Sequence, residues 1–214
     1  MSITSPLTAK GQRSAARVLQ AATTVLARNG YGGATLGRIA EEAGVDKRNV
    51  LYYYGTRETL LVRVVQTVGE RVADHIDAAV GPADSPDQLA DSLVDAMWSG
   101  ITSAPELARA YFALIGGGAG NPLVEEALHE LKAAYLQLIT HQLHNYDHTS
   151  WSLRGDLPGM ATLSLAALRG LLLEWTETGD TPTITASLQR CKDAIAAQYQ
   201  RAEPLANPKA SRSQ

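Results

Sequence analysis

The sequence of 214 residues contains a single cysteine, Cys191, and this scarcity excludes two kinds of site. One thiol forms no disulfide within the chain and cannot build a Cys-based metal site, so Cys191 is predicted to be a small apolar residue of a helix. The sequence also has no apolar run of the ~18 residues that cross a bilayer, and its start lacks the pattern of a secretory signal. We therefore expect a cytoplasmic protein without disulfides, metals or other cofactors.

Alternation of apolar and polar residues between turns, the pattern of half-buried strands, is equally scarce. Apolar residues instead recur at the i, i+3, i+4, i+7 spacing of amphipathic helices, between breaks rich in glycine and proline. The predicted fold class is therefore all-α. The predicted helices cover residues 13–28, 36–43, 47–54, 56–79, 87–103, 105–116, 122–145, 158–178 and 183–201, followed by a disordered tail over residues 202–214.

Charge is unevenly distributed, although the net charge of the chain is only -3. The first 65 residues hold nine lysines and arginines and four acidic residues, whereas the remaining residues hold ten and eighteen. The amino-terminal part therefore carries a net charge of +5 and the rest -8. This segregation favours contact of the amino-terminal part with a polyanion, and charge alone does not separate DNA from RNA or a membrane surface.

Residues 36–54 have the features of a helix-turn-helix, in which apolar contacts hold two short helices across a tight turn. We expect Gly44 to make the turn, Val45 to fill its inside and Val50 to anchor the second helix. The first turn of that second helix is where this motif meets base edges. The residues predicted to contact bases are therefore Lys47, Arg48 and Asn49.

The polar residues of this segment suit the two kinds of DNA contact. Lysine and arginine pair with guanine O6 and N7, and asparagine can make two hydrogen bonds to adenine. Hydroxyl and guanidinium groups near helix N-termini bind phosphates, which fixes the register without reading the sequence. The predicted phosphate contacts are Thr35, Tyr52, Tyr53, Thr56 and Arg57, whereas for Tyr54 core packing is an equal alternative.

Several short motifs follow one another between Gln12 and Leu61. They are Asn29-Gly30-Tyr31, Ala34-Thr35-Leu36, Ile39-Ala40, Ala43-Gly44-Val45 and Tyr53-Tyr54-Gly55-Thr56-Arg57-Glu58. In this order they resemble the TetR family of transcriptional regulators. Two positions depart from the family pattern, because Leu51 stands where tyrosine is usual and Tyr54 stands where phenylalanine is usual. The first departure removes one phosphate-binding hydroxyl, for which Tyr52 or Tyr53 can compensate.

The resemblance implies an all-helical homodimer with an N-terminal three-helix helix-turn-helix DNA-binding domain, here residues 1–55. A long helix joins it to a C-terminal helical ligand-binding and dimerisation domain, here residues 56–201. We therefore expect a ligand-responsive transcriptional regulator and not an enzyme. It would be a repressor that a small apolar or amphipathic molecule releases from a palindromic operator in double-stranded DNA, by changing the angle of the helix over residues 56–79.

The middle helices hold large, adaptable side chains that suit the walls of a pocket, although core packing is the commoner role of any one of them. The predicted pocket residues are Met97, Trp98, Ile101, Tyr111, Phe112, Tyr135, Leu138, Gln142, Met160, Leu163 and Trp175. The resemblance implies that the last two helices pair with those of a second subunit. The predicted interface residues are Leu165, Leu172, Leu188, Cys191, Ile195 and Tyr199.

Two other functions stay open. A helical-bundle enzyme would use the group of His141, His144, Asp147 and His148, whose spacing could hold a divalent metal, but no nucleophile–base set supports it. The glycine-rich run 116–120 lacks the Lys-Ser/Thr of a phosphate loop and is predicted to connect helices. The second alternative is an adaptor that binds another protein without DNA, and the positive charge of the amino-terminal part argues against it.

Overall fold

The computed structural model describes residues 8–81, 83–145, 151–154 and 156–201, and helices make up most of this part of the chain. The all-α prediction is thereby confirmed. The predicted tail over residues 202–214 lies outside the described residues, as do Asp147 and His148. The elements are α1 (Ala9–Gly33), α2 (Leu36–Ala43), α3 (Lys47–Tyr54), α4 (Arg57–Ala79), α5 (Pro86–Thr102), α6 (Pro105–Gly117), α7 (Pro122–Asn145), β1 (Trp151–Leu153), α8 (Leu157–Thr178), α9 (Pro182–Ala196) and β2 (Tyr199–Arg201).

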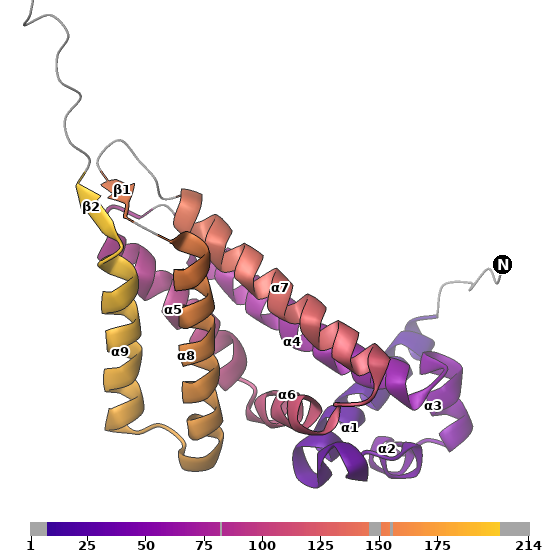
Figure 1. The fold of residues 1–214 in the computed structure, drawn as a ribbon. Helices are drawn as coiled ribbons and strands as arrows, with labels where there is room; N and C mark the ends of the chain where they lie inside the picture. The colour runs from indigo at the N-terminus through magenta and orange to yellow at the C-terminus, as the bar shows by residue number, and fades with distance from the viewer. Residues whose placement is uncertain (1–7, 82, 146–150, 155, 202–214) are drawn as a thin grey trace, which may run out of the picture.

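The first three helices lie together at one end of the molecule (Figure 1). Thr35 begins α2, because its hydroxyl accepts a hydrogen bond from the Arg38 N–H at 3.3 Å. Gly44 ends α2 in the left-handed conformation, with φ +60°, which glycine adopts without a steric cost. Asp46 stands at the capping position of α3, but its side chain makes no capping hydrogen bond.

The first helix differs from its predicted range. Asn29-Gly30 was expected to end it, but Gly30 bends the chain through a φ of +68° and helical structure continues to Gly33. The bend matters for the site because it places the carbonyl groups of Tyr31 and Ala34 next to the start of α4.

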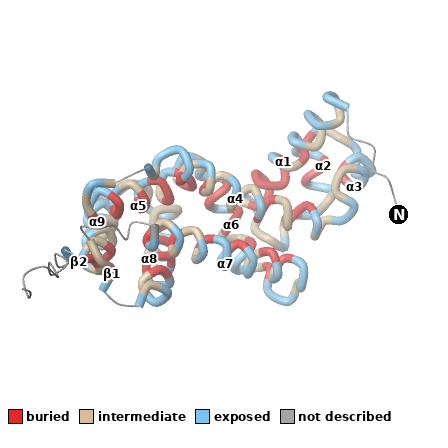
Figure 2. The backbone as a smooth tube through the Cα atoms, turned by 90° about the horizontal axis from the view of Figure 1, so that it is seen from above, coloured by how far each residue is buried: buried red, intermediate tan, exposed pale blue. Residues whose placement is uncertain are grey.

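The long helix α4 leaves this unit and packs along α5 and α7 (Figure 1). Buried residues follow one another along the helices through the centre of the molecule (Figure 2). Among the helix pairs, α1 and α6 share the most extensive contact, so α6 as well as α4 joins the two parts of the chain. The core side of α4 consists of the apolar residues that its period predicts, Leu60, Leu61, Val64, Val65, Val68, Val72 and Ile76.

The helices α8 and α9 lie at the end away from α1–α3 (Figure 1). Lys192 of α9 ties them to α5 through Asp91 and Asp95, at 3.3 and 2.8 Å. By length and composition α8 could cross a membrane, with a mean hydropathy of 1.2. Core helices of soluble proteins have the same features, so this helix by itself does not indicate a membrane protein.

A short antiparallel pair of strands corrects the prediction that the last helix reaches residue 201. The helix α9 ends at Ala196, and β2 pairs with β1, with Trp151 opposite Arg201. The Arg201 guanidinium lies 5.5 Å from the centre of the Trp151 ring, and the Tyr199 hydroxyl donates to the Leu143 carbonyl at 2.7 Å. These contacts connect residues far apart in the sequence, which helical periodicity does not reveal.

Candidate nucleic-acid interface and ligand pocket

The first turn of α3 presents three polar side chains from a helix that is anchored at its middle. Val50 is completely buried, in the same hydrophobic core as Ile39 and Ala43 of α2. The turn between the helices is closed by the Val45 N–H, which donates to the Ala40 carbonyl at 3.0 Å. Because this core fixes α3, its first turn faces solvent with a set of side chains suited to base edges in a groove about 12 Å wide. These exposed residues are Lys47, Arg48 and Asn49.

The three tyrosines of α3 divide into two kinds. Tyr52 is 73% exposed, and its ring meets that of Tyr53 edge-on, with 5.2 Å between the ring centres. The Tyr54 hydroxyl instead donates to the Ala15 carbonyl at 2.8 Å, and burial raises the pKa of this phenol. Tyr54 therefore holds α3 against α1. Leu51 is 40% exposed and offers no hydroxyl, whereas the phenols of Tyr52 and Tyr53 are exposed and half-buried, respectively.

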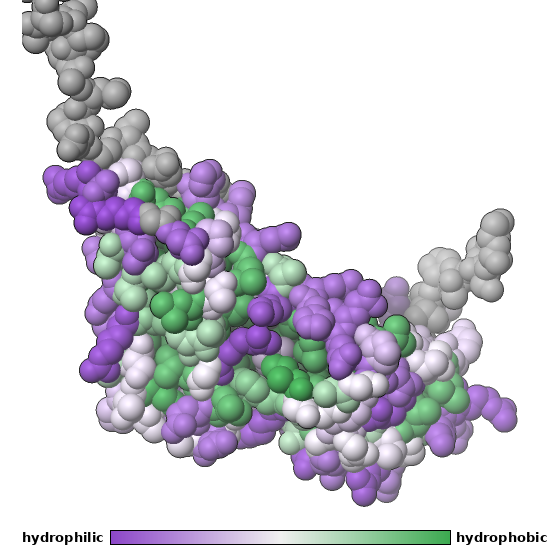
Figure 3. Space-filling model, in the orientation of Figure 1, coloured by the Kyte–Doolittle hydropathy of each residue, from purple (hydrophilic) through white to green (hydrophobic). Residues whose placement is uncertain are grey.

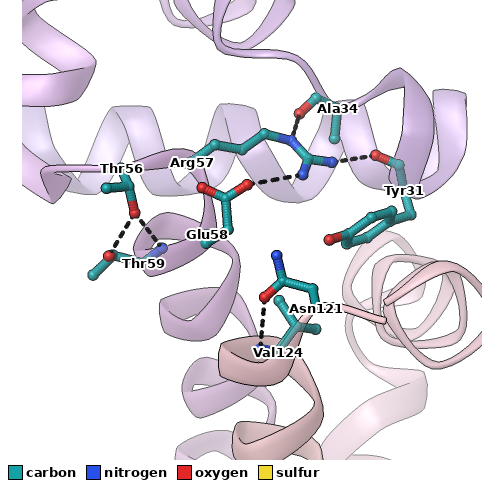
Figure 4. Close-up of polar contacts among 8 residues, drawn as sticks. All are labelled: Tyr31, Ala34, Thr56, Arg57, Glu58, Thr59, Asn121 and Val124. Atoms are coloured by element: carbon teal, nitrogen blue, oxygen red, sulfur yellow. Dashed lines mark hydrogen bonds and ion pairs between the residues drawn. The ribbon is translucent and has the colours of Figure 1, made fainter. Parts of the chain in front are cut away.

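Two of the predicted phosphate contacts are threonines that begin helices. Thr35 caps α2, and the Thr56 hydroxyl caps α4 by accepting from the Thr59 N–H at 3.0 Å (Figure 4). Both threonines are exposed. A helix N-terminus carries partial positive charge, so a phosphate placed beside either cap would meet a favourable field.

Arg57, which was predicted to bind phosphate, has its donors engaged within the protein (Figure 4). Its Nε donates to the Ala34 carbonyl at 2.7 Å, a second nitrogen donates to the Tyr31 carbonyl, and the third lies 3.3 Å from the Glu58 carboxylate. The guanidinium also lies over the Tyr31 ring, 4.5 Å from its centre, and the side chain is only 20% exposed. These contacts fasten the end of α1 to the start of α4 and favour a structural role for Arg57.

Two basic residues of α1 lie beside α3. Lys10 and Arg17 line a surface groove together with Asn49 and Tyr53. Both bases are exposed, and their spacing of seven residues places them on one side of α1. Sequence analysis did not assign them to DNA, although this spacing and their charge were visible in the sequence.

The helix α6 contacts α1, and thereby the unit formed by α1–α3, at both of its ends. Near its start, Glu106 accepts a hydrogen bond from the Thr24 hydroxyl of α1 at 2.9 Å. At its end, Gly117 lies so close to Tyr31 that a Cβ atom there would approach the Tyr31 Cβ to 2.3 Å. Tyr31 therefore contacts α6 through Gly117 and α4 through Arg57. A shift of α6 relative to α4 would act directly on the end of α1.

A largely apolar cavity lies in the second part of the molecule. Five helices contribute to its walls, α4 through Val72, α6 through Tyr111 and α7 through Tyr135, with the remainder from α5 and α8. The empty volume of the cavity, including its open mouth, is about 410 Å³. Because the walls lie close together, the space between them has room for only about two water molecules. The lining residues of α5 and α8 are Met97, Trp98, Ile101, Leu165, Leu168, Arg169 and Leu172.

Polar groups are few in this cavity, and they are hydrogen-bonded. Arg169 donates to the Tyr111 hydroxyl through Nε at 2.9 Å and also through a terminal nitrogen. The Tyr135 hydroxyl donates to the Val68 carbonyl of α4 at 3.3 Å. Burial raises the pKa of both phenols, and the charge of Arg169 opposes this rise. Both tyrosines are therefore neutral at physiological pH.

The structure brings together only part of the predicted pocket. Met97, Trp98, Ile101, Tyr111 and Tyr135 line the cavity, whereas the six other predicted residues do not. Two of those six pack behind its walls, Trp175 on the Trp98 ring at 6.3 Å and Phe112 on the Tyr111 ring at 5.4 Å. The remaining four are Leu138, Gln142, Met160 and Leu163. Arg169 was missed, because the period of α8 does not show which of its apolar sides faces the cavity.

The helices α8 and α9 present a second apolar surface, a groove open to solvent (Figure 3). Leu163 is 59% exposed on it. Of the six predicted interface residues, only Cys191 lines this groove. Leu188 is half-buried outside the groove, and the four others are buried inside the subunit. Those four are Leu165, Leu172, Ile195 and Tyr199. The groove is lined by Met160, Leu163, Ser164, Ala166, Ala167, Gly170, Leu171, Ser187, Arg190, Cys191 and Ala194.

Comparison with known proteins gives two kinds of match. Residues 18–64 match the family model of bacterial regulatory proteins of the tetR family. An HTH-type transcriptional repressor of Streptomyces coelicolor is 31% identical over 97 residues, which cover 45% of this chain and 47% of the repressor. The chain therefore matches about half the length of this curated relative.

Solved structures extend the likeness over most of the chain. A TetR-family regulator of a Rhodococcus species superposes with a TM-score of 0.75 at 19% identity, covering 86% of this chain and 99% of that one. A transcriptional regulator of Pseudomonas aeruginosa gives a TM-score of 0.71 at 24% identity, covering 89% and 93%. The regulator FadR of Bacillus subtilis, solved in complex with stearoyl-CoA, gives 0.70 at 16% identity, covering 86% and 98%. At these identities the structures establish the fold, and residues 18–64 are similar to the amino-terminal segment of the tetR family of bacterial regulatory proteins.

Proposed function

We propose that this chain is a transcriptional repressor that binds a palindromic operator as a homodimer and releases it when a small apolar or amphipathic molecule enters the cavity. The observation that carries the proposal is the exposed group Lys47, Arg48 and Asn49, held on a helix that Val50 anchors in the core. These side chains suit guanine and adenine edges. The repressor of Streptomyces coelicolor, related through about half its length, supports repression over activation.

Phosphate contacts would fix the position of α3 on DNA. Tyr52 and Tyr53 offer exposed or half-exposed phenols, and Thr35 and Thr56 stand at helix N-termini. On the other side of the groove, the exposed bases of α1 are placed to add ionic contacts, which makes binding dependent on salt. These bases are Lys10 and Arg17. We assign no DNA contact to Arg57, since each of its three guanidinium nitrogens has a partner within the protein and its side chain is only 20% exposed.

A homodimer follows from the apolar groove of α8 and α9. Contiguous apolar surface on one face marks an interaction site, and a second copy presents the same surface. A two-fold axis through this face would give two recognition helices and therefore a palindromic site. Half-sites of such helix-turn-helix dimers are about 34–36 Å apart or more. We place the protein in the cytoplasm, where bacterial DNA lies.

Release of DNA would result from widening of the cavity. As it stands the cavity has room for about two water molecules, so an effector has to part its walls. Val72 of α4 and Tyr111 of α6 belong to those walls. Both helices contact Tyr31, through Arg57 and Gly117, so their relative movement would reorient the DNA-binding unit.

Selection of genomic DNA with the purified full-length protein tests this proposal. Bound fragments are sequenced, and the protected bases are mapped on the strongest one. We expect a protected palindrome whose affinity falls steeply with salt and exceeds that of unrelated DNA by about 10³-fold or more. Equal affinity for all fragments, or no binding at low salt, would refute DNA recognition by this chain.

A further inference from the structure

Arg169 has no anionic partner among the described residues, like Arg71, which bonds to the Gly100 carbonyl and the Ser103 hydroxyl, but unlike three other partly buried cations. Lys192, Arg57 and Arg63 each have a carboxylate within 3.3 Å. Among the described residues Arg169 forms no ion pair, and its hydrogen bonds go to the neutral hydroxyl of Tyr111. A guanidinium removed from water gains most from a negatively charged partner, so this cation is under-compensated.

The described residues that line the cavity around Arg169 supply no alternative anion. The nine other residues that line the cavity are apolar or aromatic, and none of them is acidic. The Tyr135 hydroxyl is used by the Val68 carbonyl, and burial raises the pKa of both cavity phenols, which keeps them neutral. The cavity therefore presents one positive charge among apolar walls.

Hydrogen-bonding capacity is also left over at this point. The guanidinium has five N–H donors in a planar fork, of which the bonds to Tyr111 use two. The Tyr111 hydroxyl accepts these bonds, and among the described residues its own proton has no acceptor. A carboxylate has two oxygens that match such a fork, and the phenol could donate to one of them.

We infer that the effector of the proposed repressor is a compact organic carboxylate whose carboxylate group binds Arg169 and Tyr111. Its hydrocarbon part lies against Met97, Trp98 and Leu172 of the same cavity. The inference rests on the function proposed above and names the chemical class of its effector. A compact body is required because the cavity is narrow.

Such a ligand would act on the link between α6 and α8. At present Arg169 of α8 holds Tyr111 of α6 directly. A carboxylate inserted at this point takes over donors of the guanidinium and separates the two side chains. The displacement would be passed along α6 to Gly117, which contacts Tyr31 of the DNA-binding unit.

Matched pairs of small molecules test this inference on the purified full-length dimer by isothermal titration calorimetry. The probes are 3-phenylpropionate, hexanoate and octanoate, each compared with its neutral amide of nearly the same shape. The variants are Arg169→Gln and, as a control that removes an exposed arginine of α6, Arg109→Gln. We expect at least one carboxylate to bind more tightly than its amide. The substitution Arg169→Gln should lower the affinity for that carboxylate by about 10- to 100-fold and change the affinity for the amide little. Arg109→Gln should leave both unchanged.

The outcomes separate the effector class from the regulatory function. Binding of amides equal to that of carboxylates, carboxylate binding unaffected by Arg169→Gln, or no binding of any carboxylate up to millimolar concentration would overturn the inference. If neutral probes release operator DNA, the proposed regulatory function is supported and the carboxylate class of effector is refuted. A carboxylate that binds through Arg169 but leaves the DNA complex unchanged would confirm the site and refute ligand-driven release.

Discussion

The Arg57 guanidinium lies 4.5 Å from the centre of the Tyr31 ring and donates a hydrogen bond to the carbonyl of the same residue. One side chain of α4 thereby holds both the ring and the backbone at the end of α1. Tyr31 also touches Gly117 of α6. Three helices thus meet at Tyr31, between the unit that carries the recognition helix and the part that contains the cavity.

Replacing Arg57 with alanine should destabilise the fold in addition to weakening DNA binding. The change removes the hydrogen bonds of Arg57 to two backbone carbonyls and a cation over an aromatic ring, so we expect a loss of about 1–3 kcal/mol in the free energy of unfolding. Urea denaturation of Arg57→Ala and of the exposed Arg48→Ala measures the difference. If Arg57→Ala is as stable as wild type and only its DNA affinity is reduced, Arg57 contacts phosphate instead of stabilising the fold.

Adjacent glycines at the end of α6 give a matched pair of substitutions. Gly117→Ala puts a methyl group 2.3 Å from the Tyr31 Cβ, whereas nothing lies within 4 Å of a Cβ at Gly116. We expect Gly117→Ala to lower both the melting temperature and operator affinity, because Tyr31 must move. Gly116→Ala should be neutral or slightly stabilising, since alanine favours helix. Equal behaviour of the two variants in calorimetry and DNA binding would argue against close contact between α6 and Tyr31.

A charge on the apolar groove of α8 and α9 should separate the subunits. Leu163→Arg places a guanidinium in the surface that a second copy would cover. Leu123→Arg is the control, because Leu123 is similarly exposed, at 52%, but lies at the start of α7 outside this groove. Analytical ultracentrifugation should show a monomer for the first variant and a dimer for the second. A dimer that persists in Leu163→Arg would place the interface elsewhere.

Alkaline pH should weaken the fold through its buried phenols. The folded-state pKa of Tyr135 is raised above its ordinary value of 10.0 by burial. This contribution to stability is present below about pH 10 and is lost as the pH rises towards the folded-state pKa, because the unfolded chain releases the proton first. Urea denaturation between pH 7 and 11 should show a shallower alkaline decline for Tyr135→Phe than for wild type. An identical decline would mean that the ring is accessible to water.

Local patterns in the sequence predicted the DNA-binding part well. The cap at Thr35, the left-handed Gly44 and the buried Val50 are consequences of interactions within a few residues, so the positions of α2 and α3 followed from them. Lys47, Arg48 and Asn49 precede Val50 in the first turn of α3, and they are exposed whereas Val50 is buried. The structural role of Arg57 was not predicted, since the carbonyl groups that it contacts lie at a bend 23 and 26 residues earlier in the sequence.

Contacts between distant helices were not predictable in the same way. Periodicity predicted a helix over residues 158–178 but did not say which of its sides faces the cavity and which faces solvent. Leu165 and Leu172 were therefore expected at the interface, whereas they line the cavity, and Leu163 was expected in the cavity, whereas it is exposed. The pairing of β1 with β2 also joins segments about 46 residues apart, which local patterns do not reveal.

The central claim is that the first turn of α3 reads the operator, and the affinities of Lys47→Ala and Arg48→Ala for the footprinted palindrome test it most directly. Fluorescence anisotropy should show each variant weakened by about 5- to 100-fold on the palindrome and far less on unrelated DNA, with the dimer intact. Lys132→Ala, which removes an exposed lysine of α7, should bind like wild type. Unchanged affinity of both Lys47→Ala and Arg48→Ala for the palindrome would contradict the assignment of α3 as the recognition helix.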